Sequence, residues 1–132
     1  MCIRDRVKPQ LVQEFVDGQT YWMSQSMPTL EKNLSSAYLL PGFDEYLLGY
    51  RDRSAVLDQI HNNKINPGSN GIFNPTIVVD SQIVGIWKRT FRNGVVTIAP
   101  SPFTSLSEAT RRGIAAAAER YGRFVGMPIT SS

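Results

Sequence analysis

Cysteine and histidine are almost absent from this chain of 132 residues. It has one cysteine, Cys2, and one histidine, His61. A single cysteine cannot form an internal disulfide, which fits a reducing compartment. A single histidine with no cysteine near it cannot supply a zinc site of the usual spacing, so we expect no metal and interpret His61 as a surface loop residue.

Long apolar runs are missing as well. No stretch reaches the roughly 18 apolar residues of a membrane span, so we expect no membrane partner. The first six residues lack the apolar core of a secretory signal, and with the single cysteine this predicts a cytoplasmic protein. Apolar residues make up 42% of the chain and charged residues 19%, a composition typical of one globular domain.

The motifs that most often carry catalysis are also lacking. The chain has no G-x-S-x-G, no phosphate-binding P-loop and no G-x-G-x-x-G. Asp44 and Glu45 are adjacent, and on a strand their carboxylates would point to opposite faces, which is poor geometry for paired acid–base chemistry. Arg51-Asp52-Arg53 is interpreted as a turn closed by its own ion pairs. We expect no catalytic residue and no cofactor in this chain.

The first residues, Met-Cys-Ile-Arg-Asp-Arg, look like a translated sequencing adapter joined to an incomplete gene. The alternative is an ordinary polar N-terminus. We expect residues 1–6 to be foreign and exclude them from fold prediction. On this interpretation the chain is the C-terminal fragment of a larger protein.

Turn signals organise the predicted strands. Asp17-Gly18 lies between the apolar residues of 10–23, and Asn93-Gly94 lies between Ile83–Phe91 and Val95–Ala99. Such dipeptides favour two-residue hairpins, in which both turn residues take positive φ. Asp80-Ser81 is a further turn, after a strand at Thr76–Val79. The last three strands form an antiparallel meander, whose edges must be closed or covered.

The rest of the chain gives weaker signals. Two short apolar strands are predicted at Tyr38–Leu40 and Tyr46–Tyr50. We expect a helical turn at Ala55–Ile60 and a loop at Asn62–Asn70, and residues 26–36 are interpreted as a linker.

A helix is predicted at the C-terminal end. Ser105-Leu106-Ser107-Glu108 has the pattern of a capping box, and Gly126 followed by Pro128 ends the helix. Apolar residues fall on one face at helical spacing, namely Ile114, Ala117, Ala118, Tyr121, Phe124 and Val125. Such a stripe is typical of a helix that docks against a sheet, and residues 128–132 are left as a tail.

Basic residues gather toward the C-terminal end. Residues 88–123 hold seven Lys or Arg and two Glu, whereas residues 7–87 hold five basic and eight acidic residues. A basic region on a near-neutral protein can mark a polyanion partner. The alternative is a solvated helix face together with exposed strand positions.

Strand alternation places Ile83, Gly85, Trp87, Arg89 and Phe91 on one face, with Val84, Ile86, Lys88 and Thr90 on the other. Two interpretations of Trp87 follow. It is either an aromatic floor beside an Arg89 that contacts phosphate, or a core residue beside an Arg89 that reaches out to solvent.

Three stretches resemble a known family. They are Leu39–Arg53, Asn70–Thr76 and Val84–Arg89, followed by a similar ending at Ala116–Gly122. Together they are similar to the winged-helix DNA-binding-domain superfamily that includes the AlkZ-type DNA glycosylases. The resemblance covers about residues 7–127, and its first stretch is long enough to be specific.

The resemblance implies tandem winged-helix domains followed by a C-terminal β-barrel-like domain. The expected fold class is therefore α+β. Residues 37–127 would form a mostly antiparallel β-barrel-like domain with a C-terminal helix. Residues 7–25 would be the remnant of a winged-helix domain, its wing hairpin.

The resemblance also implies function. We expect a bacterial protein associated with the nucleoid, with DNA as its partner through the full-length protein and a monomer favoured. The parent would be either a monofunctional glycosylase of alkylated bases or a transcription regulator without that chemistry. The family's Gln-x-Gln or Gln-x-Asp motif is missing, since Gln10 and Gln13 have the wrong spacing and Gln25 stands alone. No catalytic residue is assigned.

Three basic residues are the candidate DNA contacts, Lys88, Arg89 and Arg92, which would touch phosphates rather than bases. The alternative is a module that braces the winged helices and never touches DNA. The polar residues of the first family-like stretch, Asp44, Arg51 and Arg53, have no assigned role. For Asp44 we favour backbone N–H bonds in a turn over a place facing the DNA-binding cleft.

Overall fold

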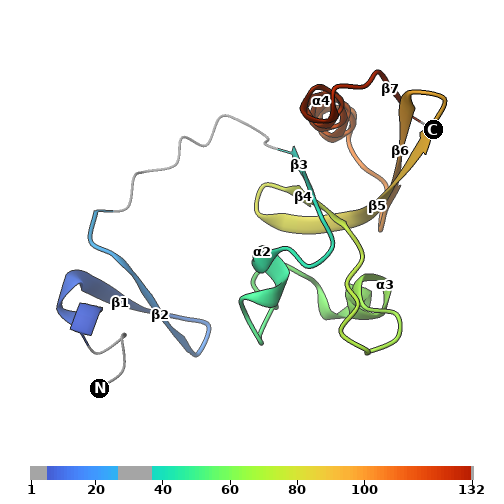
Figure 1. Ribbon diagram of the computed structural model, residues 1–132. Coiled ribbons are helices and arrows are strands. Elements are labelled where there is room, and N and C mark those ends of the chain that lie inside the picture. Colours follow the sequence, from blue (N-terminus) through green and yellow to red (C-terminus); the bar gives the residue numbers. More distant parts are fainter. Residues whose placement is uncertain (1–5, 27–36, 132) are drawn as a thin grey trace. The chain divides into compact units, whose positions relative to one another are not determined.

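The structure is a computed structural model that describes residues 6–26 and 37–131 (Figure 1). The chain divides into two compact units, residues 1–33 and 34–132. The expected linker falls almost entirely outside the described residues, as does most of the N-terminal segment expected to be foreign. No helix in the described ranges combines the length and apolar character needed to cross a bilayer.

The smaller unit contains a β-hairpin. A short 3-10 helix, η1 (Lys8–Gln10), leads into β1 (Leu11–Val16), which pairs antiparallel with β2 (Gln19–Ser24). The turn residues Asp17 and Gly18 have φ of 50° and 81°. The predicted hairpin is confirmed, because positive φ at both central residues is what a type I′ turn requires.

The larger unit is built on one five-stranded sheet in the order β3-β4-β5-β6-β7. Its strands are β3 (Ala37–Leu40), β4 (Thr76–Val79), β5 (Gln82–Arg92), β6 (Val95–Pro102) and β7 (Ile129–Ser131). Neighbouring strands are antiparallel except β6 and β7, which are parallel. The predicted meander and the α+β class are confirmed. Within the described residues β3 and β7 remain edges, so the sheet does not close into a barrel.

Helices cover both faces of this sheet (Figure 1). On one face α4 (Glu108–Val125) buries Ile114, Ala117 and Ala118 against strand residues that include Trp87 and Ile98. On the other face lie α2 (Glu45–Leu48), the 3-10 helix η2 (Gln59–His61) and α3 (Asn62–Ile65). Their core comprises Leu47, Leu57 and Ile65 with Val78 and Ile83 of the sheet. Because α4 contacts both β3 and β7, it bridges the two edges.

A β-bulge at Val84 decides which face each side chain of β5 takes. Ile77 of β4 pairs with Gly85 and Val78 pairs with Ile83, so Val84 is an extra residue on β5. Ile83 consequently packs on the α2–α3 side, whereas Trp87 packs on the α4 side. The prediction that Ile83 and Trp87 share a face is wrong, because an inserted residue interrupts the period of two.

Helix α2 stands where the sequence predicted a strand at Tyr46–Tyr50. The Asp44 carboxylate accepts a 2.9 Å hydrogen bond from the Tyr46 backbone N–H and so caps the helix. The cap favours a helix over the strand that the apolar run predicted, because a capped turn satisfies backbone N–H groups that would otherwise lack partners. The prediction that Asp44 binds a backbone N–H is confirmed.

Tyr46 links α2 to the β4–β5 turn. Its hydroxyl donates a 2.7 Å hydrogen bond to the Ser81 carbonyl. Burial raises the pKa of the Tyr46 phenol, so the hydroxyl stays protonated, and able to donate, through the physiological pH range.

Two further boundaries differ from the prediction. Residues 62–65 form α3 rather than loop, and α4 begins after Ser107, whose side chain accepts from the Thr110 N–H at 3.1 Å, rather than after Ser105. The end of α4 is as predicted, with Gly126 left-handed at φ 68°. Phe124 was expected on the buried stripe but is 87% exposed.

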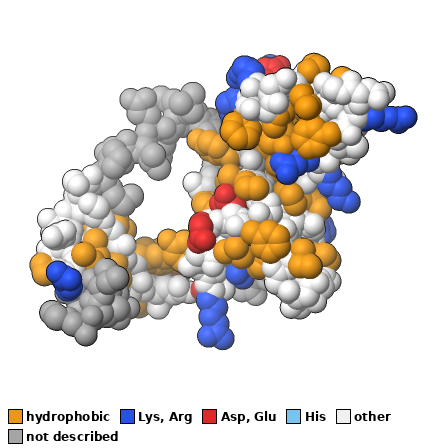
Figure 2. All heavy atoms as spheres, viewed as in Figure 1, with side chains coloured by type: hydrophobic (Ala, Val, Ile, Leu, Met, Phe, Trp, Pro, Cys, Tyr) orange, Lys and Arg blue, Asp and Glu red, His pale blue; other side chains and the backbone are white. Residues whose placement is uncertain are grey.

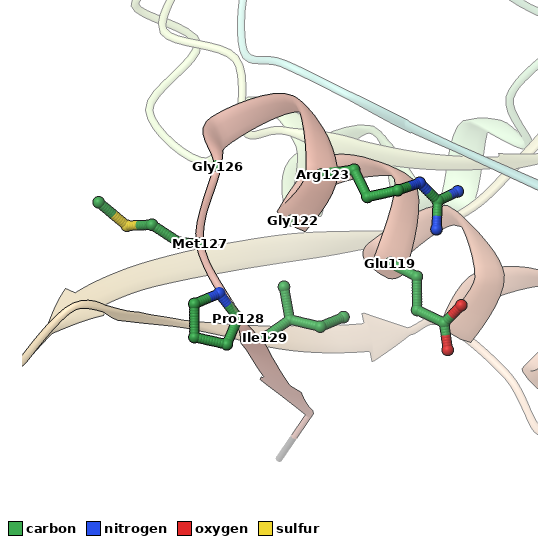
Figure 3. A pocket seen from close by; sticks show the side chains of 7 residues that line it. All are labelled: Glu119, Gly122, Arg123, Gly126, Met127, Pro128 and Ile129. Carbon is green, nitrogen blue, oxygen red and sulfur yellow. The ribbon is translucent and has the colours of Figure 1, made fainter.

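The expected tail contains β7, which lies against the last turns of α4. In Figure 3, Ile129 lies beneath the helix next to Gly122. A Cβ added at Gly122 would overlap the Cγ2 atom of Ile129. The glycine therefore permits the close approach of β7 to the helix.

We predict that Gly122→Ala destabilises the protein, by about 1–3 kcal/mol, because the new methyl group overpacks against Ile129. Helix propensity alone predicts the opposite sign, a gain of about 1 kcal/mol. Ala116→Gly, at an exposed position of the same helix, measures that propensity effect. Urea unfolding of both variants provides the comparison, and a stabilised Gly122→Ala protein would contradict the packing argument.

Candidate nucleic-acid interface

The basic residues of β5 lie on a part of the β5–β6 hairpin that extends beyond β4. Pairing with β4 ends at Ile86, whereas pairing with β6 continues to Arg92. All side chains from Lys88 to Arg92 are exposed. The hairpin closes at Asn93-Gly94 with φ of 51° and 74°, the predicted type I′ turn.

The three candidate contacts do not share one face of the hairpin. Strand alternation places Lys88 and Arg92 on the face of Ile86, and Arg89 on the α4 side. Within the described part of the chain, neither Lys88 nor Arg92 forms an ion pair or a side-chain hydrogen bond, and both are exposed. They are therefore the basic groups of β5 that are free to contact a ligand.

Arg89 is engaged inside the molecule. Its Nη1 donates to the Tyr121 hydroxyl at 2.5 Å. Its guanidinium carbon lies 5.7 Å from the centre of the Tyr121 ring and 5.8 Å from that of Phe91. Such contacts stabilise the cation over the electron-rich faces of the rings, so Arg89 holds the hairpin against α4.

Trp87 is a core residue. It is 3% exposed, its Nε1 donates to the Leu40 carbonyl at 2.9 Å, and its ring meets that of Tyr121 edge-on at 5.3 Å. The core interpretation of Trp87 is confirmed. The aromatic-floor interpretation is wrong, because the ring has almost no accessible face on which phosphate or a base could lie.

Arg53 and Arg51 of the family-like stretch have different environments. Arg53 is half-buried, donates from Nε to the Leu47 carbonyl at 2.6 Å, and lies 5.1 Å from the centre of the Phe73 ring. Arg51 is exposed. Asp52 accepts from the Ser54 N–H at 2.9 Å. Bonds to backbone groups therefore order this turn, and its closure by ion pairs stays a prediction.

His61 differs from its expected place in a surface loop. It is half-buried in η2, with its ring 4.4 Å from that of Phe103. Its Nδ1 is buried and has no hydrogen-bond partner among the residues described. In the same residues no three His, Cys, Asp or Glu side chains gather as metal ligands would.

The charged surface is dispersed on the face shown in Figure 2. Lys and Arg side chains project from several places around the larger unit, with apolar side chains between them. The uneven charge of the sequence therefore does not become one basic patch on this face.

Comparison with known proteins identifies the family. The family model described as DNA glycosylase AlkZ-like matches residues 3–124. The chain belongs to the AlkZ-like DNA glycosylase family. The expected resemblance to AlkZ-type proteins is confirmed at this level, while the wider winged-helix superfamily stays a prediction.

A solved structure also matches this AlkZ-like chain. Streptomyces sahachiroi DNA glycosylase AlkZ aligns with a TM-score of 0.66 and 20% sequence identity. The match covers 97% of this chain and 35% of that protein, so the chain spans about a third of the length of AlkZ. At this identity the likeness shows a shared fold. No curated protein matches the chain.

We predict that Asp44→Ala lowers the free energy of unfolding by about 1 kcal/mol, because the N-cap of α2 is lost. Asp44→Asn should cost less, since the amide oxygen can still accept from the Tyr46 N–H. Asp58→Ala is a matched control, because Asp58 caps η2 in the same way at 3.1 Å. Thermal unfolding measures all three, and an unchanged stability of Asp44→Ala would point to a role outside folding.

Proposed function

We propose that this chain is a DNA-binding region of an AlkZ-like protein and that the β5–β6 hairpin contacts DNA phosphates. Membership of the AlkZ-like family carries the proposal. Lys88 and Arg92 are its main contacts, because both are exposed on one face of the projecting hairpin. Phosphate contacts of this kind position a protein on DNA without reading its sequence.

Arg89 takes a lesser part in this proposal. Its Nη1 donates to the Tyr121 hydroxyl. Only the remaining guanidinium nitrogens of Arg89 could therefore contact a phosphate. Its chief contribution is to hold the hairpin that presents Lys88 and Arg92.

The activity of a whole AlkZ-like protein is part of the same proposal. Streptomyces sahachiroi AlkZ is a DNA glycosylase, and we extend that reaction class, on alkylated bases, to the longer protein in which such a region works. The hairpin of β1 and β2 is proposed to be a winged-helix wing. The sheet bridged by α4 is proposed to be the barrel-like domain. We also propose, on the same grounds, that the protein is bacterial, cytoplasmic, nucleoid-associated and monomeric.

A second candidate function is structural bracing without DNA contact. Two basic side chains favour it, because they bind inside the larger unit. Arg89 bonds Tyr121, and Arg120 donates from Nη2 to the Ala37 carbonyl at 2.6 Å. Basic residues that secure an edge strand and a hairpin need no nucleic acid to account for them.

We predict that Lys88→Ala with Arg92→Ala weakens DNA binding about equally for all sequences. The slope of log K against log salt concentration should flatten by roughly 0.9 for each lost phosphate contact. Arg111→Ala with Arg112→Ala, which removes two exposed charges from α4, is the matched control and should leave the slope near its original value. Circular dichroism confirms folding. An unchanged affinity and slope in the β5 variant would leave the bracing function.

We also predict that the chain releases no base from alkylated DNA, because the glutamine motif of the family is absent from it. Base release is measured against a reaction without protein. Release above that background, abolished by a point substitution in this chain, would contradict the prediction.

A further inference from the structure

Arg53 is held in one orientation on the α2–α3 side of the sheet. Its Nε is bonded to the Leu47 carbonyl and its guanidinium packs over Phe73. In the described parts of the chain no carboxylate pairs with it, although the side chain is half-buried. Removing a cation from water without an anion beside it is unfavourable. The arrangement suits an anion that comes from outside the chain.

Two small cavities share Arg53 as part of their walls. One has a volume of about 150 Å³ and the other about 130 Å³. Leu57 and Asn62 also line both cavities, Asn66 and Ser69 line the larger, and Arg51 and Asp52 line the smaller. The larger one has the volume of about five water molecules in the liquid, which is room for one tetrahedral oxyanion with bridging water.

The loop that forms the cavity wall is fixed by hydrogen bonds. Asn74 donates from Nδ2 to the Lys64 carbonyl at 2.9 Å and from its backbone N–H to the Ile65 carbonyl at 2.9 Å. Asn70 accepts from the Ile72 N–H at 3.1 Å. Ile65 is 2% exposed and anchors α3 in the core. A wall that is already ordered loses little conformational entropy when a ligand binds.

We propose that the pocket formed by Arg53, Asn62, Asn66 and Ser69 binds a phosphate group. The planar guanidinium matches two oxygens of an oxyanion, and the Asn62 amide and the Ser69 hydroxyl supply further donors. Arg51 and Asp52 carry opposite charges and line only the smaller cavity, so we place the anion in the larger one. The phosphate belongs either to a nucleic-acid backbone or to a free nucleotide. The site is separate from the hairpin contacts of the proposed function, because none of its residues lies on β5 or β6.

The test is a titration of the 132-residue chain with inorganic phosphate, at constant pH and ionic strength, followed by ¹H–¹⁵N NMR. We expect saturable shifts at the Arg53 Nε–H and at the backbone amides of Asn62 and Asn66. Arg53→Gln should abolish them. Arg53 also supports α2, so Asn62→Asp is the second variant. It places a negative charge in the wall and leaves the Arg53–Leu47 bond intact.

Arg112→Gln is the matched control, because it changes the net charge by the same single unit on an exposed turn of α4. Asn62→Asp should weaken phosphate binding at least about tenfold, given a repulsive charge within a few ångströms of the anion. Arg112→Gln should change it less than about twofold. No saturable shift at Arg53, or equal binding by Asn62→Asp and the original chain, would overturn the proposal.

Two further titrations distinguish the sources of phosphate. A short DNA duplex that shifts the same resonances, with weaker binding by Asn62→Asp, would assign the pocket to a backbone phosphate. Shifts with a mononucleotide and none with the duplex would assign it to a free nucleotide. Both results support the pocket. Phosphate shifts retained in a Lys88→Ala, Arg92→Ala protein separate this site from the hairpin contacts.

Discussion

The buried indole of Trp87 joins three elements that are far apart in the sequence. Its Nε1 donates to the Leu40 carbonyl of β3, and its ring packs edge-on against Tyr121 of α4. A buried N–H left without an acceptor costs roughly 1–3 kcal/mol, so the position of β3 and the packing of α4 are constrained together. Because Tyr121 also binds Arg89, the same cluster anchors the projecting hairpin.

The bulge at Val84 makes that cluster possible. Without the extra residue, the part of β5 beyond it would turn over, since a shift of one residue moves every side chain to the other face. Trp87 would then face α2 and α3, while Lys88 and Arg92 would face α4. The insertion therefore decides which basic side chains are used in folding and which remain exposed. Gly85 lies beside the bulge. A residue with a Cβ would not fit there, because that atom would lie 2.8 Å from the Pro102 Cα atom.

The hairpins were predictable from sequence, because Asp-Gly and Asn-Gly turns depend on local backbone conformation alone. The meander and the end of α4 at Gly126 followed from equally local signals. Strand β7 was not predictable, since a three-residue parallel strand depends on a glycine-lined approach to α4. The position of Lys88 and Arg92 followed from alternation, but the engagement of Arg89 required a contact with Tyr121, 32 residues away. The contacts of Arg53 were equally unpredictable, because Leu47 and Phe73 come together only in the folded unit.

The bulge also relates the two sets of basic residues to each other. Beyond Val84, the face of β5 that carries Lys88 and Arg92 is that of Ile86, which packs with Leu47 and Phe73 on the α2–α3 side. Arg53 lies over Phe73 on that side as well. Lys88, Arg92 and Arg53 therefore lie on one face of the sheet. Arg89 and Arg120 lie on the α4 side, where they donate hydrogen bonds to the Tyr121 hydroxyl and the Ala37 carbonyl. The fold thus separates basic residues that stabilise it from those left to meet an anion.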